Sequence, residues 1–266
     1  MTQGREGNAA RWIDLEGVVN MRDVGGLPTR DGGRTAYGRL IRSDNLQDLT
    51  DASVTRLVGD LGVTDIVDLR SETEMHLTGP GPLREIESLT HHHHSLVETR
   101  PTDDVAATMA SALAVHAAAP GTRDADYWTA HYRTYLDRRG PAIADALAVI
   151  AGARGAAVVH CAAGKDRTGT VVALALDVAG VPHDVIADDY ALTALRLPAI
   201  IERLMAHDFY GDTLATQRPS DQIPHAETML AILADLGERH GGTRAWLRSQ
   251  GWSGGDVEQL RARLVD

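Results

Sequence analysis

The sequence predicts an α/β fold in which a mainly parallel central sheet is flanked by helices. Short runs rich in Val, Ile and Leu, bounded by Gly or polar residues, alternate with segments of helical periodicity, and this alternation is typical of a buried parallel sheet. From His183 onward only helical segments follow. No linker or internal repeat interrupts the pattern, so we expect one domain over residues 1–266 with a helical C-terminal third.

The strands are expected early in the chain. Three apolar runs have the length and composition of buried strands, and a fourth run is weaker. They are Tyr37–Ile41, Val63–Leu69 and Ala156–His160, with Leu89–Leu96 as the weaker fourth.

Local signals place helices around these strands. The helical pattern of Thr50–Leu61 stops at Gly62, and Ser71 with Glu74 has the S-x-x-E spacing of a capping box. Pro141 suits the first turn of a helix that runs into the third strand. The later helical segments are Thr168–Val178, Asp184–Leu195, Pro198–His207, Glu227–Arg239, Thr243–Ser249 and Gly255–Leu264, with a polar loop over Tyr210–Pro224.

Composition excludes several classes of protein. A hydrophobic content of 43% with 24% charged residues is ordinary for a globular chain. The net charge of -11 argues against a general nucleic-acid binder. Met1–Arg11 has no apolar signal region and no apolar run reaches the length of a membrane span. We therefore expect no stable membrane insertion, and a protein that is cytoplasmic or exported without a cleavable signal peptide.

The chemistry is concentrated around the single cysteine, Cys161, which is followed six residues later by Arg167. That spacing alone is weak evidence, because 25 of the 266 residues are arginine. Its context is more specific: an apolar strand leads to the cysteine, small residues follow, and a helix begins near the arginine. Backbone N–H groups in such a loop converge on an anion. We expect a phosphate-binding loop.

Each residue type in this loop has a physical role. A helix N-terminus and a guanidinium stabilise the thiolate of Cys161, which is then a nucleophile. Arg167 can bind two phosphate oxygens and follow the charge of a loose phosphoryl-transfer transition state. The small residues Ala162, Ala163 and Gly164 let the backbone approach the substrate closely.

Three neighbours complete the expected site. Asp166 can protonate the leaving oxygen, Thr168 can donate its hydroxyl to the thiolate, and His160 can brace the loop. These residues predict in-line attack by Cys161, a phosphocysteine intermediate and its hydrolysis by water. The mechanism requires no metal and no other cofactor.

Lys165 is the only lysine in the chain and lies four residues after the only cysteine. We expect its ammonium at the rim of the pocket, pointing outward, where it can reach a second phosphate of a polyanionic substrate. The alternative is that Lys165 only stabilises the thiolate of Cys161.

The segment H-C-A-A-G-K-D-R-T-G, His160–Gly169, resembles the phosphate-binding loop of the atypical bacterial protein tyrosine phosphatases. Other segments resemble that family's motifs in the same order along most of the chain. They are Asn20–Gly26, Gly38–Ser43, Val67–Ser71 with Glu74, and Ala187–Tyr190.

The resemblance implies a phosphatase-like α/β fold without a metal, and activity on phosphotyrosine, often with phosphoserine, phosphothreonine and phosphoinositides. It places the catalytic cysteine and arginine at Cys161 and Arg167, the loop lysine at Lys165, and the proposed general acid at Asp166. The family's other acid candidate falls on Asp68. From its position at the end of a strand, Asp68 should share the sheet edge with Cys161. The alternative is a structural hydrogen bond to Arg70 or to a neighbouring loop.

The resemblance also implies a helical lid, which we expect within residues 183–222. Apolar residues there are candidates for covering the site, although residues at that helical spacing more often belong to an ordinary core. They are Leu195, Leu197, Ile200, Leu204, Met205 and Phe209.

Some features have simpler or competing interpretations. In an extended strand the rings of His91–His94 alternate between two sides, so we expect no metal site there. A phosphoinositide-preferring lipid phosphatase is one alternative function. A sulfur-transfer enzyme or an inactive phosphate-binding module is less favoured, and an arsenate reductase would need a second thiol, which this chain does not have.

Overall fold

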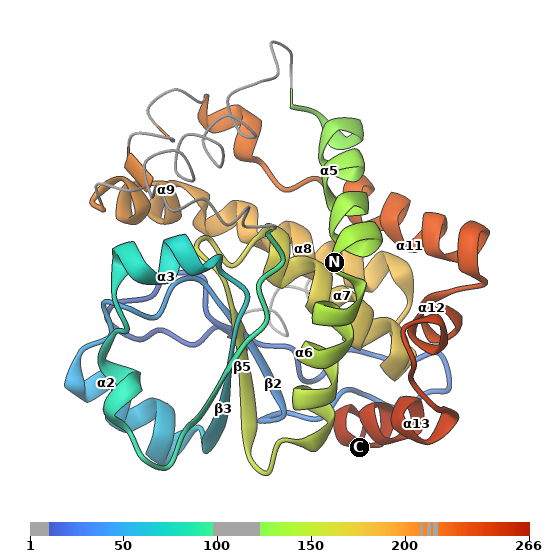
Figure 1. Cartoon of the computed structure of the whole chain (residues 1–266), viewed down its shortest axis with the longest axis horizontal. Coiled ribbons are helices and arrows are strands. Elements are labelled where there is room, and N and C mark those ends of the chain that lie inside the picture. Colours follow the sequence, from blue (N-terminus) through green and yellow to red (C-terminus); the bar gives the residue numbers. More distant parts are fainter. Residues whose placement is uncertain (1–10, 98–122, 208–209, 212–213, 215–217) are drawn as a thin grey trace.

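The computed structural model describes residues 11–97, 123–207, 210–211, 214 and 218–266. At its centre lies a five-stranded sheet with the order β1-β2-β5-β3-β4 (Figure 1). The strands are β1 Arg22–Asp23, β2 Leu40–Ser43, β3 Val63–Asp68, β4 Thr90–His93 and β5 Ala156–His160. Only β1 runs antiparallel to its neighbour, so the predicted mainly parallel sheet is confirmed.

Alternate residues of the central strands enter two separate cores. Val67 and Val159 belong to the larger core, whereas Ile66 and Val158 belong to the smaller one. The helices of the larger core are α5 Ala125–Arg138, α6 Gly140–Gly152, α7 Asp166–Ala179, α8 His183–Ala191, α11 Ala226–His240, α12 Thr243–Ser249 and α13 Gly254–Leu264. The smaller core is covered by α2 Asp51–Thr55, the π-helix η1 Arg56–Asp60 and the 3₁₀ helix η2 Pro82–Glu85.

The remaining helices lie near the ends of the strands. They are α3 Glu72–Thr78, the 3₁₀ helix η3 Leu192–Arg196, α9 Leu197–Met205 and the 3₁₀ helix η4 Pro219–Gln222. Figure 1 shows α8 and α9 crossing the upper end of the sheet, on the side where α3 also lies.

Several helix ends follow the predicted signals. The capping box at α3 is present: the Ser71 hydroxyl accepts from the Glu74 N–H, and the Glu74 carboxylate accepts from the Ser71 N–H. The chain leaves η1 through Gly62, whose φ is +60°, and α7 ends at Gly180, whose φ is +89°. Both glycines adopt the left-handed conformation that side chains disfavour.

Some elements differ from the prediction. The strand expected at Tyr37–Ile41 lies instead at Leu40–Ser43, and Tyr37 is 54% exposed. The helix α5 was not predicted. The segment Asp184–Leu195 divides into α8 and η3, and the expected loop Tyr210–Pro224 contains η4, with residues 212–213 and 215–217 outside the described residues.

The carboxyl ends of three parallel strands meet at one edge of the sheet. Ser43 of β2 and Asp68 of β3 both pair in register with His160 of β5. Cys161 follows His160 directly, so it shares this edge with Asp68 as predicted. Within the described ranges, no helix combines the length and apolar character needed to cross a membrane.

Candidate active site

The cysteine lies at the junction between β5 and α7. Residues 156–160 are all buried, and Cys161 itself is 1% exposed. The next four residues form a loop, and α7 begins at Asp166. The sequence therefore places a buried thiol beside the N-terminus of a fourteen-residue helix.

The carbonyl groups of the loop are held from its outer side. Three donors bind the carbonyls of residues 162, 163 and 164 in turn: the N–H of Asn45 at 3.0 Å, Nδ2 of Asn20 at 2.9 Å and Nη2 of Arg42 at 2.9 Å. Asn20 and Arg42 belong to the N-terminal segments Asn20–Gly26 and Gly38–Ser43, and Asn45 lies two residues after the second of these segments. They orient the peptide groups of the loop.

Gly164 is required by this packing. Its φ is +65°, and a Cβ atom there would lie 2.5 Å from the carbonyl oxygen of Ser43. Any side chain would collide with the backbone that follows β2. The glycine therefore fixes how closely the loop approaches the neighbouring strand.

The N–H groups of residues 162–165 have no acceptor among the described residues. The first N–H groups of α7 likewise lack intrahelical acceptors, as at any helix N-terminus. Because the loop carbonyls point to Asn20, Arg42 and Asn45, these donors are available to an anion. The arrangement is suited to an oxyanion such as phosphate.

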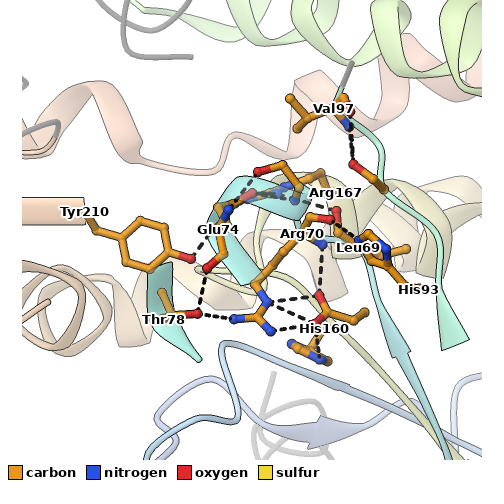
Figure 2. Close-up of polar contacts among 12 residues, drawn as sticks. Leu69, Arg70, Glu74, Thr78, His93, Val97, His160, Arg167 and Tyr210 are labelled. Carbon is orange, nitrogen blue, oxygen red and sulfur yellow. Dashed lines mark hydrogen bonds and ion pairs between the residues drawn. The ribbon is translucent and has the colours of Figure 1, made fainter. Parts of the chain in front are cut away.

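Arg167 is held by Glu74 of α3. Its Nη1 lies 2.5 Å from Oε2 and its Nη2 lies 2.8 Å from Oε1. The Tyr210 hydroxyl donates to Oε1 at 3.3 Å, so Glu74 lies between the two side chains (Figure 2). Burial alone would lower the pKa of Arg167, but Glu74 and Cys161 raise it well above its usual value.

Asp68 is engaged in a structural ion pair. Its carboxylate accepts from Arg70 Nε at 3.0 Å and from Arg70 Nη2 at 2.6 Å, and His160 Nε2 lies 3.6 Å away. The expected hydrogen bond to Arg70 is thus present. Burial would raise the pKa of Asp68, but His160 and Arg70 outweigh it and hold the pKa well below its usual value. Burial lowers the pKa of His160 to about 4.

Asp166 occupies the first turn of α7. Its Oδ1 accepts a hydrogen bond from the hydroxyl of Tyr132 and lies 3.2 Å from Nζ of Lys165. Burial would raise the pKa of Asp166, but Lys165 and Tyr132 together lower it. Unlike Asp68, this carboxyl belongs to the first residue of the helix that directly follows the loop.

The side chain of Lys165 does not lie at the rim of the pocket. The side chain is 1% exposed, and Nζ lies 4.0 Å from the centre of the Trp128 ring and 3.3 Å from Oε1 of Gln222. Burial lowers the pKa of its ammonium group. The predicted outward position at the rim is wrong, because Trp128 of α5 and Gln222 of η4 cover the amine.

Thr168 also differs from its expected contact. Its Oγ1 is buried and has no hydrogen-bond partner among the described residues, so the expected bond to Cys161 is not formed here. The His160 Nε2 atom lies 3.6 Å from Oδ2 of Asp68, and its Nδ1 atom has no hydrogen-bond partner among the described residues.

Two groups of residues near the loop were not predicted. The first is the face of α5 that carries Trp128, Tyr132 and Tyr135 and lies against Lys165 and Asp166. Its signal in the sequence is the spacing of the three aromatic residues by four and then three positions.

The second group is a buried cluster in which Asp189 of α8 binds three arginines. Arg11, Arg22 and Arg42 approach its carboxylate at 2.7, 3.3 and 2.8 Å. Asp23 also interacts with Arg11, and Arg42 also donates to the loop carbonyl of Gly164. The cluster therefore joins α8 to the loop through Arg42.

The apolar residues expected in the lid differ in their packing. Ile200 and Leu204 of α9 form a small core with Ala162 and Tyr210. Leu197 is also buried, whereas Leu195 and Met205 are 71% and 51% exposed and so do not cover the loop. Phe209 lies outside the described residues.

The histidine side chains of the tract His91–His94 contact other groups of the protein. The rings of His92 and His94 stack at 6.5 Å, and His92 Nε2 lies 2.9 Å from Oδ1 of Asp65. His93 Nε2 contacts the carbonyl of Arg70. In the part of the chain that the structure describes, no three His, Cys, Asp or Glu side chains are grouped to hold a metal.

Comparison with known proteins agrees with this geometry. The chain is 32% identical over 285 aligned positions to the triple specificity protein phosphatase PtpB of Mycobacterium tuberculosis, covering 95% of this chain and 98% of that protein. It is 38% identical over 117 positions to a tyrosine-protein phosphatase of Nostoc commune, covering 41% of this chain and 39% of that protein. The family model described as the tyrosine phosphatase family matches residues 13–266. The chain therefore belongs to the tyrosine phosphatase family.

Proposed function

We propose that Cys161 and Arg167 hydrolyse phosphomonoesters through a phosphocysteine intermediate. The observation that carries this proposal is the loop itself: its carbonyls are bound from outside, and its N–H groups have no acceptor among the described residues. A phosphoryl group in the loop would accept from these donors while Arg167 binds two of its oxygens.

The first step is attack by the Cys161 sulfur on phosphorus. The S–P bond forms, the bond from phosphorus to the leaving oxygen breaks, and that oxygen takes the proton of Asp166. In the second step water attacks the phosphocysteine, Asp166 takes back a proton, and inorganic phosphate leaves with the thiolate restored. Arg167 follows the charge of the phosphoryl group through both steps.

Asp166 is the better general-acid candidate of the two aspartates. It lies at the start of α7, directly after the loop that carries the nucleophile, and its side chain is 20% exposed. Both carboxylate oxygens of Asp68 instead accept hydrogen bonds from Arg70. We therefore assign Asp68 to holding Arg70 and His160, rather than to proton transfer.

The substrates we propose are phosphotyrosine proteins, with phosphoserine, phosphothreonine and phosphoinositides as further substrates. Support comes from the relative that is named a triple specificity phosphatase and matches nearly the whole chain. The expectation that the enzyme acts in the cytoplasm, or after export without a cleavable signal peptide, is tested by cell fractionation.

We also propose that residues 183–222 form the lid of a single phosphatase domain, residues 1–266. The packing of Ile200 and Leu204 on Ala162 supports a cover over the loop. Arg203 adds polar contacts, with Nη1 2.6 Å from Asp44 and Nη2 2.9 Å from Asp48. These contacts join α9 to the chain that follows β2.

The test is hydrolysis of p-nitrophenyl phosphate in the presence of a chelator, followed by a panel of phosphopeptides and phosphoinositides. The wild type should turn over, whereas Cys161→Ser should bind inorganic phosphate without turnover, because the loop donors and Arg167 remain. More than a trace of activity in Cys161→Ser would refute the proposed mechanism. The values of kcat/KM on the panel show whether phosphotyrosine or phosphoinositide is the better substrate.

A further inference from the structure

Two tyrosines from different helices approach the carboxylate of Asp166. Tyr132 of α5 donates its hydroxyl to Oδ1, and the hydroxyl oxygens of Tyr132 and Tyr190 lie 2.6 Å apart. Tyr190 belongs to α8. The two tyrosines are 0% and 1% exposed, so solvent does not compete for either hydroxyl.

The direction of these hydrogen bonds follows from counting protons. Each phenol has one proton to donate, and an ionised carboxylate can only accept. While Asp166 is ionised, Tyr132 must give its proton to Oδ1, and the contact with Tyr190 therefore runs from the Tyr190 hydroxyl to the Tyr132 oxygen. A donor that itself accepts a hydrogen bond is polarised and donates more strongly.

The two oxygens of Asp166 have different surroundings. Oδ1 accepts from Tyr132 and lies 3.2 Å from Nζ of Lys165. The hydrogen bond that a described residue donates to this carboxylate, from Tyr132, goes to Oδ1 and not to Oδ2, and the Asp166 side chain is 20% exposed. The oxygen that remains available to bind a proton and deliver it to a substrate is therefore Oδ2.

We propose that Tyr132, supported by Tyr190, is a positioning residue that reserves Oδ2 of Asp166 for proton transfer and sets the pH range over which this carboxyl is protonated. The inference rests on the proposed role of Asp166 as the general acid. Neither tyrosine needs to touch the substrate. Both act through the carboxylate.

Other groups around Asp166 act on the same equilibrium. Burial favours its neutral form, while Lys165, Tyr132 and His131 favour its charged form and together lower its pKa. Arg167 lies one residue away on the same helix, and the hydroxyl of Tyr135 lies close enough for Asp166 to raise the pKa of that phenol. Tyr132→Phe removes only the hydroxyl of Tyr132 and leaves these other groups in the protein.

Removing the Tyr132 hydroxyl should therefore raise the pKa of Asp166. A general acid works only while it is protonated, so the alkaline limb of kcat/KM should move to higher pH in Tyr132→Phe. One hydrogen bond to a charged group corresponds to a shift of about one pH unit. Tyr190→Phe should shift the limb in the same direction by less, because Tyr190 acts only through Tyr132.

The experiment measures kcat/KM against pH with an alkyl phosphomonoester, whose leaving group needs the proton. Tyr127→Phe is the matched control: Tyr127 lies on the same helix, and its hydroxyl has no partner among the described residues. It should leave the alkaline limb unchanged. Circular dichroism and thermal melting check that each variant is folded, and Tyr190→Phe carries the test if Tyr132→Phe does not fold.

The outcomes separate this inference from the proposed function. If Asp166→Asn removes the alkaline limb but Tyr132→Phe and Tyr190→Phe leave it at the wild-type pH, the positioning role is refuted and the general acid stands. If Asp166→Asn retains the alkaline limb at the wild-type pH, the general-acid role of Asp166 and the positioning role of the tyrosines are both overturned. A fall in rate that is equal at every pH would assign the tyrosines to packing alone and would also refute the inference.

Discussion

Glu74 and Arg167 face each other with both carboxylate oxygens against both terminal guanidinium nitrogens. This contact joins α3 to the first turn of α7 and fixes the plane of the guanidinium. Glu74 is also the last residue of the capping box of α3. One side chain therefore both starts a helix and orients the phosphate-binding arginine.

The first prediction is that Glu74→Gln lowers kcat/KM on the order of 100-fold, since a displaced Arg167 no longer matches the phosphoryl oxygens. Glutamine preserves the capping box, so the thermal stability should fall much less than the activity. The measurement is steady-state kinetics with p-nitrophenyl phosphate beside a thermal melt. Glu72→Gln, an exposed change in the same helical turn, is the control, and a wild-type rate in Glu74→Gln would contradict the role of Glu74.

The second prediction concerns the leaving group. Asp166→Asn should slow alkyl phosphates far more than aryl phosphates, because a phenolate with a low pKa leaves without a proton. The ratio of kcat/KM for the two substrates, measured in wild type and variant, gives the result. Equal losses on both would show that Asp166 only positions the substrate.

The third prediction tests our expectation that Asp68 is not the general acid. Asp68→Asn should leave the aryl-to-alkyl ratio near its wild-type value but lower the free energy of unfolding by about 2 kcal/mol, since it weakens a buried, charge-assisted contact with Arg70. Denaturant unfolding measures this loss, with Asp60→Asn, which changes an exposed carboxyl, as the control. A change in the ratio confined to Asp68→Asn would move the general acid to Asp68.

The pH dependence of this loss follows from the lowered pKa of Asp68. A carboxyl whose pKa is lower in the folded state contributes stability that is present above its unfolded pKa of about 3.9 and is lost as the pH falls through the folded value. The difference between wild type and Asp68→Asn should therefore be constant near neutral pH and shrink below about pH 4. A difference that grows in acid would contradict the ion pair.

The fourth prediction concerns the buried ammonium of Lys165. Lys165→Met retains the packing against Trp128 but removes the charge, so it should lower kcat/KM by similar factors for a phosphotyrosine peptide and for a phosphoinositide. The alkaline limb should also move to higher pH, because Lys165 lowers the pKa of Asp166. A loss of about tenfold confined to the phosphoinositide would instead restore the specificity role expected from the sequence.

The position of Lys165 shows where sequence reasoning ends. Residue spacing places the lysine in the loop, but the groups that cover it come from distant parts of the chain. Trp128 lies on α5 and Gln222 on η4. Residue spacing along the chain carries no information on such long-range contacts, so the burial of the ammonium could not be predicted from it.

The helix α5 was missed for a related reason. Its buried face consists mainly of tryptophan and tyrosine, with polar and charged residues between them, and a search for aliphatic periodicity does not detect it. The shift of β2 has a similar origin. Arg42 and Ser43 are polar but buried in the strand, because Asp189 and the carbonyl of Gly164 satisfy the charge of Arg42.

The elements predicted correctly have strong local signals. The strand before Cys161 is continuously apolar, the capping box of α3 is encoded within four residues, and Gly180 ends α7 through its left-handed conformation. The order of strand, loop and helix around Cys161 followed from these signals alone. Local chemistry thus fixed the phosphate-binding loop, whereas its surroundings depend on tertiary packing.

The most direct test of the account is to trap the phosphoryl group on the enzyme. Turnover of an aryl phosphate is quenched with acid within milliseconds, and the peptide containing residue 161 is analysed by mass spectrometry. We expect a phosphoryl group on Cys161 of the wild type, and more of it in Asp166→Asn, where the water that attacks the intermediate lacks its base. A phosphoryl group on any other residue, or turnover with no phosphorylated Cys161 in either protein, would contradict the central claim.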